Sequence, residues 1–214
     1  MLDKHGRSAL HAVALGVGAR LGVCAKLLLD HTGPPLLNIN LPDLRGNSPL
    51  HAAAEMGQVG ICKLMLRAKG VEKESRNALG ETPLGTAARH NRIEILEALV
   101  LEGAYTEARG LDGRTPLGHA VSHPQPEGVR LLLESGADVN VRMLDGGNPL
   151  TVAAQSGNHR QLLLLKDAGA DLNSVTDAGY EEAKRRSSYS VLRSIHALRR
   201  NRSTCIRRNE ILSR

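Results

Sequence analysis

The chain of 214 residues carries 28 Lys or Arg and 22 Asp or Glu, and its formal net charge is +6. It has no Phe, no Trp and only three Tyr, which argues against one large globular core, because such cores depend on aromatic side chains. Leu, Ala and Val must therefore fill the interior, and these residues suit thin layers of stacked helices.

The excess positive charge lies at the C-terminal end of the chain. Residues 181–214 carry ten Lys or Arg and three Glu, a net charge of +7, whereas residues 1–180 carry 18 Lys or Arg and 19 Asp or Glu, a net charge of −1. A general electrostatic attraction to nucleic acid is therefore not expected for the first 180 residues, and it remains open for the C-terminal segment.

Several features indicate the compartment. The N-terminal residues MLDKHGRSAL lack the apolar stretch of a signal peptide, and apolar runs such as 98–101 and 162–165 are far too short to cross a membrane. Cys24, Cys62 and Cys205 are far apart and lack the spacing of a zinc site, which indicates a reducing environment. We expect an intracellular protein, cytoplasmic or nuclear, with no membrane insertion, no metal and no cofactor.

A short motif recurs along the chain with a period close to 33 residues. Each copy places a Leu after Pro or Ala and a small polar residue, at Leu10, Leu50, Leu84, Leu117 and Leu150. A fixed period of this size is typical of a solenoid, in which each unit buries its apolar face only against its neighbours.

Residues 110–142 show how one unit is built. A turn is predicted at residues 111–113, where Gly supplies a positive φ. Thr115 caps a short first helix, and Pro126 begins a second helix. Gly136 follows the second helix, as glycines at helix C-termini do. Each unit is therefore predicted to consist of a turn, two helices and a loop.

These units resemble ankyrin repeats, whose signature is Thr-Pro-Leu-His-x-Ala. The copies in this chain are SALHAVA (8–14), SPLHAAA (48–54), TPLGTAA (82–88), TPLGHAV (115–121) and NPLTVAA (148–154). A second signature, Gly-Ala-Asp-Val-Asn, matches strongly at 136–140 and 169–173 and more weakly at 103–107 and 70–74. The resemblance implies an all-α ankyrin-repeat solenoid of stacked helix-turn-helix units joined by β-hairpin-like loops.

The period divides the chain into successive segments. They are repeat one, long and atypical, at 3–42; repeats two to five at 43–76, 77–109, 110–142 and 143–174; a degenerate capping helix pair at 175–200; and a basic mobile tail at 201–214. No polar capping repeat precedes the first repeat, so either that repeat caps itself or the chain is a piece of a longer protein. We expect that it caps itself.

The motif histidine varies along the array. In the ankyrin family this imidazole ties adjacent loops together by hydrogen bonds. It is kept at His11 and His51, whereas Gly85, Gly118 and Thr151 replace it in the later repeats. We therefore expect repeats three to five to be held together less firmly than repeats one and two.

Nothing in the sequence indicates catalysis. No Gly-x-Ser-x-Gly motif is present, and Gly16, Gly18 and Gly22 miss the spacing of a dinucleotide-binding loop. His119 and His123 have the spacing of a metal pair on one helix, but no third ligand is fixed, and a structural or surface role is the better interpretation. The chain is therefore predicted not to be an enzyme.

The surface remains as the site of function. Proteins that resemble this chain bind partners on their concave side, which is built from the loop tips and the first helix of each unit. The residues at these positions are Arg45, Asn47, Glu55, Met56, Leu79, Glu81, Arg89, His90, Asp112, Arg114, Ser122, His123, Asp145 and Gln155. Arg89, Arg114 and Met56 are the predicted anchors, because Arg and Met are enriched at interface centres. The resemblance thus implies a monomeric adaptor or scaffold for a protein partner.

The basic C-terminal segment supports alternatives. Arg185 and Arg186 precede Arg199, Arg200 and Arg202 with the spacing of a bipartite nuclear import signal, although a solvated basic helix face also accounts for them. One alternative function is a nuclear regulatory protein whose C-terminal segment contacts nucleic acid or chromatin. Another is the targeting segment of a larger multidomain enzyme.

Overall fold

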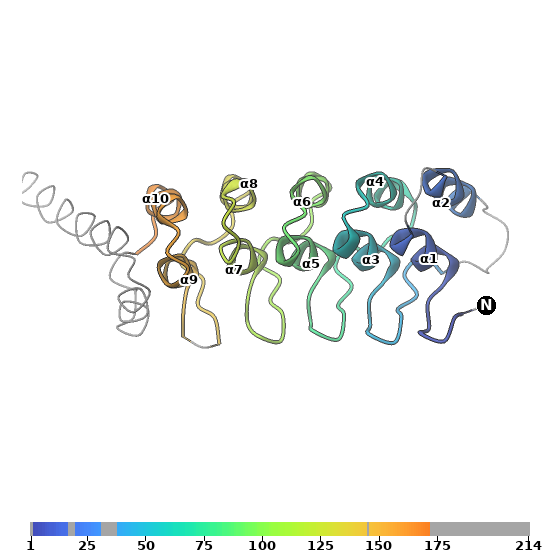
Figure 1. The fold of residues 1–214 in the computed structure, drawn as a ribbon, viewed down its shortest axis with the longest axis horizontal. Coiled ribbons are helices and arrows are strands. Elements are labelled where there is room, and N and C mark those ends of the chain that lie inside the picture. The colour runs from blue at the N-terminus through green and yellow to red at the C-terminus, as the bar shows by residue number, and fades with distance from the viewer. Residues whose placement is uncertain (1, 17–19, 31–37, 145, 172–214) are drawn as a thin grey trace, which may run out of the picture.

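A computed structural model describes residues 2–16, 20–30, 38–144 and 146–171 of the chain. In these ranges the regular structure consists of ten α-helices with no strand, arranged as five helix pairs, which confirms the predicted all-α solenoid (Figure 1). We number these pairs as repeats one to five. The predicted capping pair at 175–200 and tail at 201–214 lie outside the described residues, and the repeat boundaries stay a prediction.

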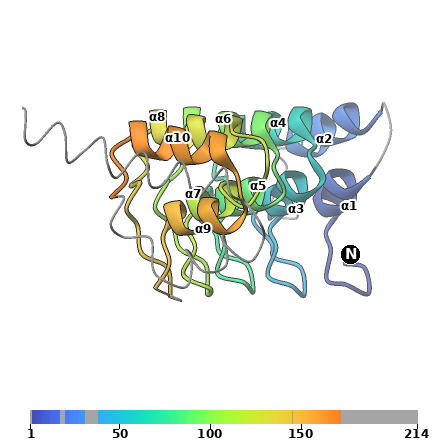
Figure 2. The ribbon, with the colours of Figure 1, turned by 60° about the vertical axis from the view of Figure 1, so that its left-hand side comes forward.

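The helices form two layers, and hairpin loops project from one of them (Figures 1 and 2). The inner layer, beside the loops, contains α1 (Ala9–Leu15), α3 (Pro49–Met56), α5 (Pro83–Arg89), α7 (Pro116–Ala120) and α9 (Pro149–Gln155). The outer layer contains α2 (Leu21–Asp30), α4 (Val59–Arg67), α6 (Ile93–Leu101), α8 (Glu127–Glu134) and α10 (His159–Asp167). Each helix packs against the next helix of its own layer and against its partner in the repeat.

The small polar residue of each motif fixes the start of the inner helix. Thr82 Oγ1 accepts the Gly85 N–H at 3.3 Å, and Thr115 Oγ1 accepts the Gly118 N–H at 3.3 Å. A proline follows as the first helical residue in repeats two to five. Since the first N–H groups of a helix lack internal partners, Thr and Pro there define where the helix begins.

The core is a row of aliphatic side chains between the two layers. The motif leucines are at most 2% exposed in every repeat, and small alanines fill the contacts between neighbouring inner helices. This arrangement explains how the chain folds without Phe or Trp: each layer is thin, so Leu and Ala close the space between helices at normal packing density. A rigid frame results, from which the loops project.

Histidines join the first three repeats. Ser8 donates its backbone N–H to His11 Nδ1 at 3.2 Å, so Nδ1 is an acceptor and Nε2 donates to the Asn47 carbonyl oxygen at 2.7 Å. His51 Nε2 contacts the Glu81 carbonyl oxygen at 2.9 Å in the same way. Burial lowers the pKa of His51, which keeps this ring neutral.

Arginines join the later repeats, where the motif histidine is missing. The Arg76 guanidinium donates to the Arg109 carbonyl oxygen, and the Arg109 guanidinium donates to the Arg142 carbonyl oxygen. We call these three residues the arginine ladder. The expectation that repeats three to five are held together less firmly did not take the arginine ladder into account. In these repeats an arginine side chain of the preceding hairpin supplies a hydrogen bond between repeats where the motif imidazole is missing.

A second set of cross-repeat hydrogen bonds lies between the outer helices and the hairpins. Asn40 Oδ1, Glu74 Oε1, Glu107 Oε1 and Asn140 Oδ1 each accept a backbone N–H from the next repeat. Glu74 and Glu107 occupy the Asn position of the two weaker signature copies. The weaker copies therefore keep the interaction, because a carboxylate oxygen accepts the same N–H as an amide oxygen.

Candidate functional site

The hairpin loops and the inner helices form one continuous surface, which we call the inner face. Two pockets lie along it. A pocket of about 500 Å³ spans repeats two and three, and a pocket of about 550 Å³ spans repeats three to five. Arg89 lines both of them, so they adjoin at the end of α5.

Eleven of the fourteen residues predicted on the concave face line these two pockets. The first pocket is lined by Arg45, Asn47, Glu55, Leu79, Glu81, Arg89 and His90, and the second by Arg89, Asp112, Arg114, Ser122 and His123. The repeat pattern thus identified residues that the fold brings together from three hairpins and from the ends of α3, α5 and α7. Whether they bind a protein stays a prediction.

The other predicted positions do not join the pockets. Met56 is exposed at the end of α3 and lines neither pocket, and Gln155 is half-buried at the end of α9. Asp145 lies outside the described residues, as do the five arginines of the candidate nuclear import signal. Of the three predicted anchors, therefore, only Arg89 and Arg114 lie in a pocket.

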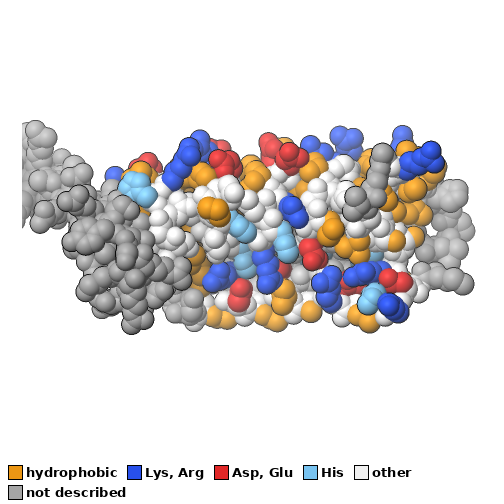
Figure 3. Space-filling view, in the orientation of Figure 1, with side chains coloured by type: hydrophobic (Ala, Val, Ile, Leu, Met, Phe, Trp, Pro, Cys, Tyr) orange, Lys and Arg blue, Asp and Glu red, His pale blue; other side chains and the backbone are white. Residues whose placement is uncertain are grey.

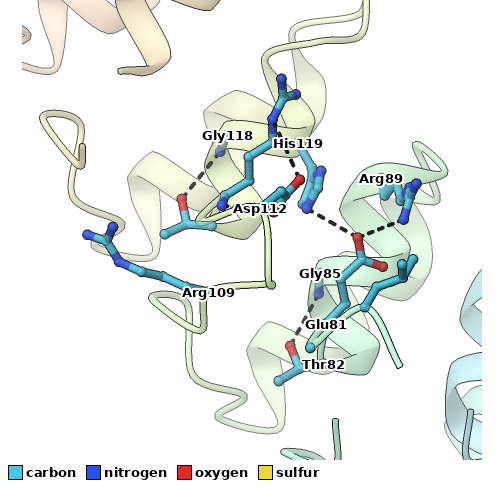
Figure 4. A network of polar contacts seen from close by, with 12 residues as sticks. Glu81, Thr82, Gly85, Arg89, Arg109, Asp112, Gly118 and His119 are labelled. Atoms are coloured by element: carbon cyan, nitrogen blue, oxygen red, sulfur yellow. Dashed lines mark hydrogen bonds and ion pairs between the residues drawn. The ribbon is translucent and has the colours of Figure 1, made fainter. Parts of the chain in front are cut away.

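A buried carboxylate links two repeats beneath the pockets (Figure 4). The Glu81 side chain comes from the third hairpin, is 4% exposed, and lies between Arg89 of α5 and His119 of α7. Its Oε1 atom accepts a hydrogen bond from Arg89 Nη1 at 2.9 Å and lies 3.4 Å from His119 Nε2. The second contact is within ion-pair range but is not aligned as a hydrogen bond, so His119 Nε2 has no hydrogen-bond partner.

Burial controls the protonation of this cluster. Desolvation lowers the pKa of His119 to about 4, so the ring is neutral at pH 7 and its contact with Glu81 is not a salt bridge. Desolvation also raises the pKa of the Glu81 carboxyl, against the opposing effect of the Arg89 guanidinium. The positive charge that compensates Glu81 is therefore that of Arg89, whose side chain remains 44% exposed.

Arg114 is held in a similar way on the next hairpin. Its Nε atom lies 3.7 Å from Asp112 Oδ2, and its Nη1 donates to Ser122 Oγ at 3.1 Å. Its side chain is 33% exposed, so part of the guanidinium faces solvent within the pocket. Both central arginines are thus oriented by neighbouring side chains and keep N–H groups for a ligand, since a guanidinium has five donors.

Two features of the inner face were not predicted. The interpretation of His119 as a structural or surface residue left its burial open, and the side chain is buried and lines the second pocket. Exposed leucines also occupy the hairpin tips, with Leu44 78%, Leu111 73% and Leu144 75% exposed. The period would have identified the leucines, because each falls at the same place before a motif. The burial of His119 has no comparable signal in the sequence.

Figure 3 shows how charge is arranged on the inner face. Histidine side chains gather over α5 and α7, with Lys or Arg and Asp or Glu beside them, and hydrophobic side chains follow the edge formed by the loops. No group of three or more His, Cys, Asp or Glu side chains in the described part of the chain has the arrangement of a metal site. In the same part, no helix combines the length and apolar character needed to cross a bilayer.

Comparison with known proteins identifies the repeats. A family model described as "Ankyrin repeats (3 copies)" matches residues 1–77, 60–143 and 109–176. The chain is 33% identical over 114 residues to a transient receptor potential cation channel subfamily A member 1 homolog of Caenorhabditis elegans, and 34% identical over 87 residues to neurogenic locus notch homolog protein 1 of Xenopus tropicalis. These alignments cover 49% and 41% of the chain but only 9% and 3% of the relatives. An alpha-latrotoxin of Latrodectus hasselti matches 45% of the chain at 29% identity, and 7% of that toxin is covered.

Proposed function

The chain belongs to the ankyrin repeat family, and from this premise we propose that it is a non-enzymatic adaptor or scaffold that binds a protein partner on its inner face. Ankyrin repeats are generally protein–protein interaction modules. Because the chain spans less than a tenth of the relatives' length, their activities and partners are not assigned to it.

One observation carries the proposal: side chains from successive repeats meet in two adjoining pockets that share Arg89. The frame beneath them is rigid, because the cross-repeat hydrogen bonds and the buried leucine row fix each loop relative to the next. Binding to an ordered surface costs less conformational entropy than binding to a mobile one. Two partly exposed, oriented arginines at the centre of the surface match the side chains that dominate binding energy in many interfaces.

The test is affinity capture from cell lysate, followed by mass spectrometry, with the intact chain and three variants. Arg89→Glu/Arg114→Glu reverses charge at the centre of the inner face. Arg67→Glu/Arg130→Glu makes the same change at exposed arginines of α4 and α8 and serves as the control. A truncation after Tyr180 removes the basic C-terminal segment. Circular dichroism and thermal melts check that each variant folds.

The proposal expects a set of proteins that both the intact chain and the control retain, in moderate salt and after nuclease treatment, and that the inner-face variant loses. If captured proteins ignore the inner-face change but disappear with the truncation or with nuclease, the proposal fails. The working surface would then be the basic C-terminal segment, as in the alternative of a nuclear regulatory protein.

A further inference from the structure

Arginine side chains outnumber carboxylates on the inner face over repeats three to five. The pocket of about 550 Å³ shares Ser122 and His123 with a third pocket of about 590 Å³, which extends to the start of α10. We call these two pockets together the basic groove. Its cationic lining residues are Arg89, Arg114 and Arg160, the histidines His119, His123 and His159 also line it, and among the described residues Asp112 supplies its single lining carboxylate.

That single carboxylate is already engaged within its own hairpin. Asp112 Oδ1 accepts the Arg114 backbone N–H at 3.0 Å, and Oδ2 lies 3.7 Å from Arg114 Nε. Asp112 therefore balances part of Arg114, and the buried Glu81 carboxylate beneath the groove balances part of Arg89. Both guanidinium groups keep further N–H donors for a ligand. An anionic ligand would meet a favourable potential there, whereas a cationic ligand would be repelled.

The walls of the groove hold their polar groups in fixed positions. His123 Nε2 contacts the Arg89 carbonyl oxygen at 2.8 Å, which ties α5 to the end of the fourth inner helix. The His119 side chain is only 7% exposed, yet its Nε2 has no hydrogen-bond partner. This nitrogen is buried against Glu81, so the ring supports the wall of the groove from beneath and leaves ligand contacts to the arginines.

The other end of the inner face differs in character. The pocket over repeats two and three contains Arg45 and Arg89, but also the carboxylates of Glu55 and Glu81 and the exposed side chains of Leu44 and Leu79. It is balanced in charge and partly apolar. The inner face therefore changes along its length from mixed and apolar to basic, which would orient an extended ligand in one direction.

Two observations favour a peptide over a nucleic acid. The lining of the basic groove includes no Phe, Trp or Tyr, so the large aromatic platforms on which bases commonly stack are missing from this part of the described structure. Residues 1–180 also carry a net charge of −1, so the excess positive charge is local to the groove. A local excess suits a short acidic segment better than a long phosphate backbone, whose binding relies on broad attraction.

We propose that the basic groove binds an extended acidic segment of the partner protein, with Asp or Glu side chains on Arg89, Arg114 and Arg160. This inference rests on the proposed function and specifies the chemistry of the partner. Guanidinium groups bind carboxylates with two parallel hydrogen bonds. Neighbouring helices pack 8–10 Å apart and an extended chain advances about 3.3 Å per residue, so about one acidic residue in every three would meet a repeat.

The test is selection from a library of displayed random 12-residue peptides against the full chain, with counter-selection on the Arg89→Glu/Arg114→Glu variant. The selected peptides are then synthesised, together with isosteres in which Asn and Gln replace Asp and Glu. Fluorescence anisotropy measures their binding to the chain, to Arg114→Gln, to Arg160→Gln and to the control Arg130→Gln. A labelled 20-nucleotide oligothymidine is measured in parallel.

We expect the selected peptides to be enriched in Asp and Glu. The amide isosteres should bind at least tenfold more weakly, and each groove variant should weaken binding about tenfold, because each removes charge-assisted hydrogen bonds. The control should leave the affinity unchanged.

Peptides without acidic enrichment that still require the inner face would overturn this inference and leave the proposed function standing. Tighter binding of oligothymidine, lost in Arg114→Gln, would overturn it in favour of nucleic acid. Failure to recover any peptide that distinguishes the chain from the counter-selected variant would also count against it.

Discussion

At the scale of single residues, His119 is the side chain whose environment differs most from its sequence context. It lies in a short helix beside His123, but the fold buries it against Glu81 from the preceding repeat. Two basic groups and one acid in this cluster would suggest a salt-bridge network. The buried imidazole is instead neutral at pH 7, because desolvation outweighs the nearby charges.

This burial predicts a pH dependence of stability. The pKa of His119 falls from 6.5 in the unfolded chain to about 4 in the folded chain. Between these values the unfolded chain binds a proton that the folded chain does not, so stability falls as the pH decreases from 6.5 to 4 and then levels off. The full effect is up to about 3 kcal/mol.

Urea denaturation of the intact chain and of His119→Gln, at intervals from pH 7.5 to 4, measures the effect. The difference between the two free energies of unfolding isolates His119, because Glu81, His51 and the other titrating groups are present in both proteins. We expect the free energy of unfolding of the variant to rise steadily relative to that of the intact chain as the pH decreases below 6.5. A difference that stays constant across this range would show that His119 is not buried in its neutral form.

The sequence predicted the location of a side chain correctly where the position in the repeat decides whether that side chain is exposed. It placed Arg89 and Arg114 on the inner face from their position in the repeat and from the ankyrin resemblance, and both line pockets. It did not place His119, because its burial depends on the contact between the third hairpin and α7. It also chose Met56 as an anchor from its residue type, and that side chain lies outside both pockets.

At the scale of elements, the ties between repeats change type along the array. Histidines connect repeats one to three, and the arginine ladder connects the hairpins that precede α5, α7 and α9. The sequence indicated the first kind through its signature and missed the second. The period also relates the three ladder residues, since Arg76, Arg109 and Arg142 recur every 33 residues. Their contacts with carbonyl oxygens, however, could be recognised only from the geometry of the hairpins.

The ladder predicts a local loss of stability when it is broken. Arg109→Met removes the bond to the Arg142 carbonyl oxygen and keeps the aliphatic stem, so it should cost about 1 kcal/mol. Hydrogen exchange should accelerate most in α9 and α10. Arg130→Met, at an exposed position on α8, is the control and should change neither quantity. Equal effects from the two variants would mean that the ladder does not stabilise the array.

Replacing a hairpin glycine should destabilise the chain, whereas replacing a helical glycine should stabilise it. Gly113 has φ +75°, and a Cβ atom there would lie 2.5 Å from Leu144 Cγ, so Gly113→Ala combines backbone strain with a clash. We expect it to cost at least 1–2 kcal/mol, on the order of other changes at positive φ. Gly60 lies on α4 with open space around it, and Gly60→Ala should gain up to about 1 kcal/mol. Thermal melts of both variants test this: the melting temperature should fall for Gly113→Ala and rise for Gly60→Ala.

At the scale of the whole molecule, stability is the sum of repeats and of the contacts between neighbours, because each repeat touches only the adjacent ones. The effect of a substitution on stability therefore depends on its position in the array as much as on the side chain that it removes. Leu10 and Leu117 are both completely buried motif leucines, but Leu10 belongs to the first repeat and Leu117 to the fourth. Each change to Ala removes the same side-chain volume.

Leu10→Ala is expected to loosen repeat one and leave the rest folded, whereas Leu117→Ala, which costs roughly 2–5 kcal/mol at its own site, should destabilise repeats three to five together. Hydrogen exchange with mass spectrometry, at a denaturant concentration below the midpoint, separates the two patterns. Global acceleration in both variants would show that the array unfolds as one unit and that the nearest-neighbour description is wrong.

The backbone hydrogen bonds between hairpins run from the later repeat to the earlier one. The backbone N–H groups of Leu44, Ala78 and Leu111 donate to carbonyl oxygens of the preceding hairpin. Leu44, Leu111 and Leu144 also cover the tip glycine of that hairpin. Successive hairpins thus repeat the same pairing, in which a backbone N–H of one hairpin donates to a carbonyl oxygen of the preceding hairpin. A repeat could therefore be duplicated, deleted or exchanged, and the length of the array could change in evolution or by design, while these backbone contacts between hairpins stayed the same.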